Sequence, residues 1–175
     1  WGTWFWFPPV FAHNAPCCPL IPLAIETMAK NGKKNKAGGR PRDVPLATLL
    51  QLARGDQRAE LGRLVAEGGI SNINGADGTG WTALQMACYE GHSEVVKLLV
   101  SAGASMDQAM NNGATPLYIA CQKGHSEVAQ LLVSAGASVD QAINDGATPL
   151  YIACQKNHPE VVQLLVSAGA SVDQA

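Results

Sequence analysis

The sequence predicts an all-α solenoid of stacked helix–turn–helix units joined by hairpin loops. The first observation is an internal repeat: residues 111–142 and 144–175 differ at four of 32 positions, and residues 78–110 follow the same frame. The second is that each unit holds two short helical patterns, below the roughly 12–15 residues that an isolated helix needs. Such helices must pack on neighbouring units, so we expect stability to come from interfaces along one dimension.

The first helix of each unit is predicted from its two ends. Thr115 is a good helix cap, and Pro116 fits the first helical position, where its missing N–H group needs no partner. Gly124 follows the apolar pattern and predicts the end of this helix. Because the Thr-Pro pair recurs 33 residues later, the next unit should begin in the same way.

A second helix is predicted after a short turn. Pro159 stands where the preceding unit has Ser126, and because proline fits only near a helix start, a helix should begin there. Glu127 lies in the first turn of this helix, where the helix dipole favours a carboxylate. Gly136 predicts its end.

Loops with turn signals separate the units. Asparagine or aspartate followed by glycine at 111–113 and 144–146 predicts tight turns. Asp107, Asp140 and Asp173 recur 33 residues apart at the base of these loops, and we expect them to stabilise the turns.

Residues 43–77 read as a degenerate first unit. Asp43 is the predicted cap of a helix that runs through Leu46 to Ala53, and Gly55 with Asp56 makes the turn to a second helix around Leu61. The outer positions are polar, as an N-terminal capping unit requires.

The C-terminal end has no such polar cap. We expect Val161, Leu164 and Leu165 to leave apolar surface without a neighbour, and the array to continue beyond Ala175.

The repeated residues resemble the ankyrin repeat family. The period of 33 matches, as do Thr-Pro-Leu, the Gly-His pairs, the Leu-Leu pairs and Gly-Ala before each loop. Gln85, Tyr118 and Tyr151 stand where the family has a histidine after Thr-Pro-Leu. The predicted divisions are a disordered apolar head and basic linker at 1–42, a capping repeat at 43–77, and ankyrin repeats at 78–110, 111–143 and 144–175.

Charge is unevenly distributed along the chain. Residues 1–29 carry a net charge of −1, residues 30–42 carry +6 and residues 43–175 carry −7. For the basic segment a solvated linker is the simplest interpretation; a nuclear-localisation or nucleic-acid-contacting arm is the alternative, although it lacks aromatic residues for base stacking. The aromatic, proline-rich head at 1–25 is read as unstructured or as upstream of a start at Met28, or as a targeting or partner-binding peptide.

The residue pattern argues against catalysis. Cys88, Cys121 and Cys154 each precede a histidine by four residues, but both types recur in every unit, as packing positions do. We interpret each as a buried cysteine and a histidine that bonds backbone at the turn. We therefore predict no enzyme activity, no cofactor and no metal, and an intracellular protein in the cytoplasm or nucleus.

The resemblance implies a protein partner bound on the concave side of the stack. Trp81 and Tyr89 are the predicted anchors, since these residue types dominate binding hot spots; packing of Trp81 against the loop at 70–79 is the alternative. We expect a monomer, and the other function considered is a regulatory or targeting fragment of a larger ankyrin-containing enzyme such as a kinase or ubiquitin ligase. The predicted partner-binding positions are Thr79, Trp81, Tyr89, Glu90, Asn111, Asn112, Gln122, Lys123, Asn144, Asp145, Gln155 and Lys156.

Overall fold

The computed structural model describes residues 44–68 and 70–172. The chain divides into two compact units, Trp1–Gly38 and Gly39–Ala175, and all described residues belong to the second. The head and basic linker predicted at 1–42, with their targeting and nucleic-acid hypotheses, lie outside the described residues. In the part that is described, no helix has both the length and the apolar character needed to cross a membrane.

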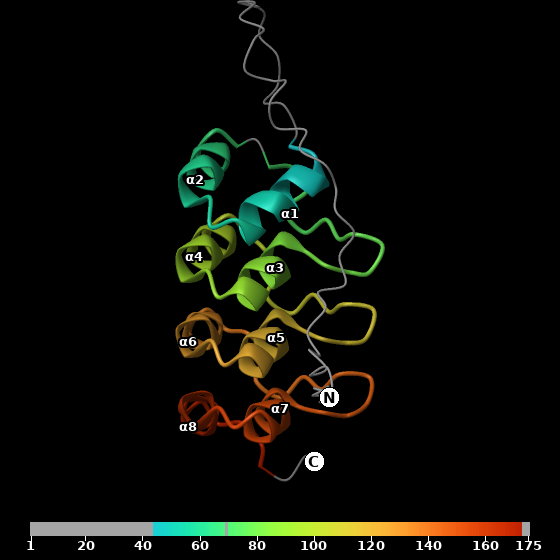
Figure 1. Ribbon diagram of the computed structural model, residues 1–175, viewed down its shortest axis with the longest axis vertical. Helices are drawn as coiled ribbons and strands as arrows, with labels where there is room; N and C mark the ends of the chain where they lie inside the picture. Colours follow the sequence, from blue (N-terminus) through green and yellow to red (C-terminus); the bar gives the residue numbers. More distant parts are fainter. Residues whose placement is uncertain (1–43, 69, 173–175) are drawn as a thin grey trace, which may run out of the picture. The chain divides into compact units, whose positions relative to one another are not determined.

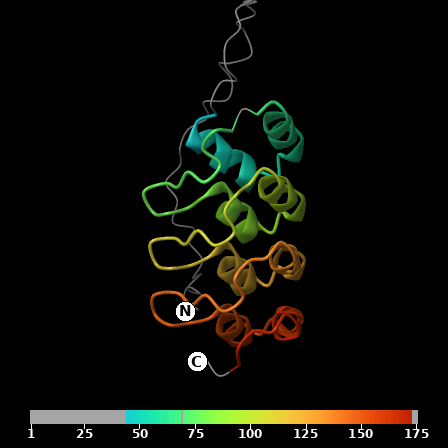
Figure 2. The same cartoon turned by 180° about the vertical axis from the view of Figure 1, so that it is seen from behind.

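Paired helices build the whole of the described part. A short turn joins the two helices of a pair, and a longer loop leads to the next pair. The first helices stack in one column and the second helices in another, and the loops project beside the first column (Figures 1 and 2). In chain order the helices are α1 (Leu46–Arg54), α2 (Arg58–Ala66), α3 (Ala83–Glu90), α4 (Ser93–Ser101), α5 (Pro116–Lys123), α6 (Ser126–Ser134), α7 (Pro149–Gln155) and α8 (Pro159–Ser167).

The helix ends predicted from the repeat are confirmed. Thr115 caps α5, where its hydroxyl oxygen accepts a hydrogen bond from the N–H group of Tyr118 at 3.2 Å, and Pro116 is the first helical residue. Gly124 ends α5 in the left-handed conformation, with φ of 76°. Pro159 begins α8, as its restricted backbone requires.

The last pair departs from this pattern at Asn157. This residue replaces the glycine that ends the earlier first helices and keeps a positive φ of 58°. Asparagine is one of the few side chains that adopt this conformation readily. Helix α7 ends at Gln155, whereas α5 continues to Lys123, the position equivalent to Lys156.

The first pair has the predicted helices but not the predicted cap. Helix α1 begins at Leu46, so Pro45 and not Asp43 is the capping residue, and it makes no side-chain cap bond. Proline has no N–H group to satisfy and its φ of −58° already suits a helix start, so it can open the helix without a polar side chain. Asp43 itself lies outside the described residues.

The apolar side chains between the two columns form one core. Leu132 and its equivalents Leu99 and Leu165 are fully buried. The prediction that Val161 and Leu165 would be exposed at the end of the stack is therefore wrong: they are 1% and 0% exposed. Both lie on the side of α8 that packs against the other helices, and Leu164, the third residue of that prediction, is partly buried. The exposed large apolar side chains at this end are Tyr151, Val166 and Val172.

The histidines link each pair to the one before it. In each case the Nε2–H group donates to a backbone carbonyl near the end of the preceding first helix, because a carbonyl oxygen only accepts. This matches the predicted backbone role but places the partner one unit away. The Nε2–O distances are 2.9 Å for His92–Arg54, 3.2 Å for His125–Tyr89 and 3.3 Å for His158–Gln122.

The loop aspartates also act between units. The carboxylate of Asp107 accepts hydrogen bonds from the N–H and hydroxyl groups of Ser138 at 2.9 and 3.2 Å, and Asp140 holds Ser171 in the same way at 2.9 and 2.7 Å. This differs from the prediction that these residues stabilise their own turns, because the side-chain bonds of Asp107 and Asp140 reach the next loop. Asp173 lies outside the described residues.

Candidate functional site

The loops and the first helices form one surface, which we call the inner face and which carries every predicted binding position. Thr79, Asn111, Asn112, Asn144 and Asp145 lie on the loops. The remaining positions lie beside or at the ends of α3, α5 and α7: Trp81, Tyr89, Glu90, Gln122, Lys123, Gln155 and Lys156.

Three of these residues form an aromatic and cationic cluster. The rings of Trp81 and Tyr89 meet edge to face, with centroids 5.5 Å apart and an interplanar angle of 88°. The Nζ atom of Lys123 lies 3.9 Å from the centroid of the Tyr89 ring, in cation–π contact. The cluster joins two units, since Lys123 comes from α5 and the two rings come from the unit before it.

A cavity of about 200 Å³ lies beside this cluster. Its size suits an apolar side chain, because a cavity of roughly 150 Å³ accepts a benzene-sized group. Most of its lining is apolar or aromatic, with amides at Asn112 and Gln122. The lining residues are Trp81, Tyr89, Met110, Asn112, Ala114, Tyr118, Ile119, Gln122 and Ile143.

Asp77 fixes the loop that presents Trp81. Its carboxylate accepts hydrogen bonds from the N–H groups of Thr79 and Trp81, both at 2.9 Å, and from the Thr79 hydroxyl at 2.6 Å. Partial burial acts to raise the pKa of Asp77, but these hydrogen bonds together outweigh it and hold the pKa below its ordinary value. The Thr79 side chain is thus engaged within the loop.

The loop asparagines tie neighbouring loops together. The side-chain amide of Asn111 donates to the carbonyl of Gly78 at 3.2 Å, and that of Asn144 donates to the carbonyl of Asn111 at 3.1 Å. Asn112 supports its own turn, where its side-chain oxygen accepts from the Ala114 N–H group at 3.0 Å. These amides therefore set the spacing of the loops.

The charged positions at the helix ends differ in their environment. Glu90 is half-buried and pairs with Arg54 of the preceding unit at 3.4 Å. Gln155 and Lys156 are exposed at the end of α7. Glu90 thus joins two units, whereas Lys156 presents its charge to solvent.

The prediction of a buried cysteine in each unit is confirmed for Cys88 and Cys121 but is wrong for Cys154, which is exposed in the last pair. Cys88 and Cys121 are fully buried, and burial raises the pKa of both thiols, to about 12 for Cys121. Their histidines bond the preceding unit. Among the described residues, no cluster of three or more histidine, cysteine or acidic side chains is placed to hold a metal ion.

Sequence reasoning missed part of the cavity lining. Met110 and Ile143 occupy the same position 33 residues apart, and this apolar repeat within otherwise polar loops was the available signal. Tyr118 lines the cavity while only 6% exposed, because its ring lies between units. The pattern of a single helix shows neither how one unit docks on the next nor the cavity that forms beside them.

Gln85 stands at the place of the histidine of the family motif and is hydrogen-bonded at both ends of its amide group. It is fully buried. Its side-chain oxygen accepts from the Thr82 N–H group at 2.8 Å, and its amide nitrogen donates to the carbonyls of Gln108 at 2.8 Å and Ala114 at 3.4 Å. One side chain thereby closes the helix cap and anchors the following loop.

Comparison with known proteins agrees with this architecture. A family model described as ankyrin repeats (3 copies) matches residues 26–110 and 102–175. A mitochondrial disaggregase of Homo sapiens is 40% identical over 58 residues, which make up 33% of this chain and 8% of that protein. The chain therefore spans less than a tenth of that relative. Because the family model covers most of the sequence and the fold has the stacked helix pairs that its repeats require, the chain belongs to the ankyrin repeat family, a family of protein-interaction modules.

Proposed function

We propose that the chain is a noncatalytic platform that binds a partner protein on the inner face, the concave side of its ankyrin stack. The observation that carries this proposal is the cluster of Trp81, Tyr89 and Lys123 at the edge of an apolar cavity. Tryptophan and tyrosine bury a large area at a small loss of conformational entropy, so they make effective anchors in an interface.

The rigidity of the surface supports the same function. Hydrogen bonds from Asp77 hold the loop before Trp81, and the asparagine amides hold each loop to the one before it. A surface that is ordered before binding loses less conformational entropy when the partner docks. The buried thiols of Cys88 and Cys121 and the engaged histidines support a noncatalytic role, because these residues are used in packing and in bonds between units.

The test is affinity capture from native lysate with the full chain as bait. Three baits are compared: the unaltered chain, a Trp81→Ala/Tyr89→Ala variant and a control that alters exposed residues of the second helices, Gln130→Ala/Gln163→Ala. Urea unfolding of each bait verifies that it is folded. We expect proteins retained by the first and third baits to be lost from the inner-face variant. Identical sets on all three baits would place binding elsewhere.

The human relative favours a second candidate function, in which these repeats are the regulatory or targeting part of an enzyme. The supporting observation is that the matched stretch forms 8% of a protein named as a disaggregase. Kinases and ubiquitin ligases are other examples of enzymes that such repeats could belong to. An antibody to the repeats distinguishes the candidates in native extract. A band near 18.3 kDa supports the free module, and a much larger polypeptide supports the enzyme-linked form.

A further inference from the structure

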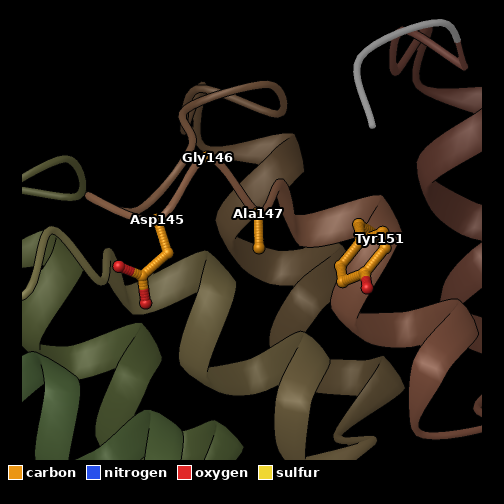
Figure 3. A pocket seen from close by; sticks show the side chains of 4 residues that line it. All are labelled: Asp145, Gly146, Ala147 and Tyr151. Atoms are coloured by element: carbon orange, nitrogen blue, oxygen red, sulfur yellow. The ribbon is translucent and has the colours of Figure 1, made fainter.

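A second cavity opens on the inner face at the last loop. It has a volume of about 380 Å³ and is lined by Asp145, Gly146, Ala147 and Tyr151. Figure 3 shows that the side chains of Asp145, Ala147 and Tyr151 project to the same side of the backbone, with the carboxylate at one edge and the phenol ring at the other. The carboxylate of Asp145 is exposed here, and an exposed carboxylate is a suitable partner for a cationic side chain.

The carboxylate also lies close to the first cavity. Tyr118 lines that cavity, and its pKa is raised by burial, then by the nearby charge of Asp145 and by Tyr151. Ile143, two residues before Asp145, is another of its lining residues. Asp145 therefore stands next to the apolar cavity beside Trp81.

The preceding repeat provides an internal comparison for this position. Asn112 occupies the place of Asp145, and this is one of the four differences between the stretches 111–142 and 144–175. Asn112 is exposed even though the loop after it is present, with the Asn144 N–H group donating to its carbonyl at 3.0 Å. The position is thus accessible on a loop whose neighbour is in place, and only the later unit carries a charge there.

The net negative charge of residues 43–175 also favours a basic partner. Residues 43–175 carry six basic and thirteen acidic residues, a net charge of −7. Such a field attracts a basic partner at long range and raises its association rate. Among the described residues, Asp145 has no cationic side chain within salt-bridge distance. Its charge is accordingly available to a partner.

Resting on the proposed function, we infer that the partner contributes an extended segment that places an apolar side chain in the cavity beside Trp81 and an arginine against the carboxylate of Asp145. Arginine fits better than lysine, because its planar guanidinium group can donate two parallel hydrogen bonds to a carboxylate. The apolar side chain provides the anchor, and the arginine fixes the register of the segment along the stack.

The experiment is selection from a phage-displayed library of random linear peptides on the full chain. Enriched peptides are synthesised and their affinities measured for the unaltered chain, for Asp145→Asn and for Trp81→Ala. Asp145→Asn is a matched change, because the chain itself has asparagine at the equivalent position 112. The control is Gln163→Ala on the exposed face of α8.

We expect the enriched peptides to pair an apolar residue with an arginine. Asp145→Asn should weaken them about threefold to fivefold and reduce the salt dependence of binding, as for an exposed ion pair. Trp81→Ala should weaken them by more than about tenfold. Replacing the peptide arginine should weaken binding to the unaltered chain but change little for Asp145→Asn.

The other outcomes separate the two proposals. Peptides that require Trp81 but bind Asp145→Asn equally well overturn the arginine site and leave the inner-face platform standing. Peptides whose affinity is unchanged by both Asp145→Asn and Trp81→Ala count against both proposals. A selection that enriches no peptide overturns the inference of a linear segment, whereas the lysate capture still tests the platform.

Discussion

The imidazole ring of His158 covers Gly124 of the preceding unit, so closely that a Cβ atom on Gly124 would lie 2.6 Å from the ring. The same relationship joins His125 to Gly91, where the distance would be 2.7 Å. In both pairs the histidine also donates to a carbonyl of the preceding unit. The glycine therefore has two functions: it ends its own helix and leaves room for the next unit to dock.

Gly124→Ala should destabilise the stack more than Gly136→Ala does. Both residues have positive φ, 76° and 96°, so alanine strains the backbone at each by roughly 1–2 kcal/mol. Only Gly124 has a neighbour in the way, which should add about 1–3 kcal/mol for overpacking against His158. Urea unfolding midpoints measure the difference. Equal losses for the two variants would show that the ring moves aside freely.

Leu132→Ala should reduce the free energy of unfolding by roughly 2–5 kcal/mol. Leu132 is 0% exposed in the shared core, so its truncation leaves a cavity between α5 and α6 and their neighbours. Val166→Ala, at a position 51% exposed, is the control and should change stability by less than about 0.5 kcal/mol. Chemical denaturation monitored by circular dichroism gives both values. A small effect at Leu132 would contradict its place in the core.

Gln85→Leu should cost about 2 kcal/mol or more. The substitution introduces an apolar side chain of similar size and leaves the Thr82 N–H group and two carbonyls without their side-chain partner. Gln85→His should retain most of the stability, because histidine occupies this place in the family motif. If the leucine variant is as stable as the unaltered chain, the hydrogen bonds of Gln85 make no net contribution to the free energy of unfolding.

Acid should weaken the loop that presents Trp81 through Asp77. The folded-state pKa of Asp77 lies below its ordinary value of 3.8, so its ionised form stabilises the fold above that pH. This contribution falls as the pH drops from about 4 through the folded-state pKa. Asp77→Asn lacks the titrating group, so its stability should decline less steeply across this acid range. Unfolding midpoints measured at a series of pH values test this, and parallel curves for the two proteins would contradict it.

The features of the fold that the sequence predicts correctly are those set by local signals. Thr115, Gly124 and Pro159 specify helix ends through bonds and backbone angles of adjacent residues, and all three act as expected. Local signals do not predict the contacts between units. The carboxylate of Asp107, for example, accepts a hydrogen bond from Ser138, which lies thirty-one residues away in the sequence. Such contacts depend on how one unit is rotated and shifted against the next, and a helical pattern does not contain that information.

The sequence likewise predicts some parts of the candidate site and not others. Trp81 and Tyr89 stood out because the later repeats have alanine and glutamine in their places. The cavity beside them was not foreseen, because it needs Met110, Ile143 and Tyr118 to converge from two units. The prediction that Val161 and Leu165 are exposed is wrong for a related reason. The helical pattern predicts that an apolar residue is buried, but it does not show which neighbouring helix covers it.

Thiol labelling should separate the three repeat cysteines according to their burial. Cys88 and Cys121 are enclosed in the core, where burial raises the pKa of each thiol and so suppresses the reactive thiolate, whereas Cys154 is exposed at the equivalent position of the last repeat. With a mild alkylating reagent at neutral pH, mass mapping should find modified Cys154 early and the other two only after urea is added. Because the residues around Cys121 and Cys154 are nearly identical in sequence, a difference in rate between these two cysteines reports packing by the next unit. Rapid modification of Cys121 in the folded protein would mean that the unit at 144–175 opens away from α5 on the timescale of the reaction.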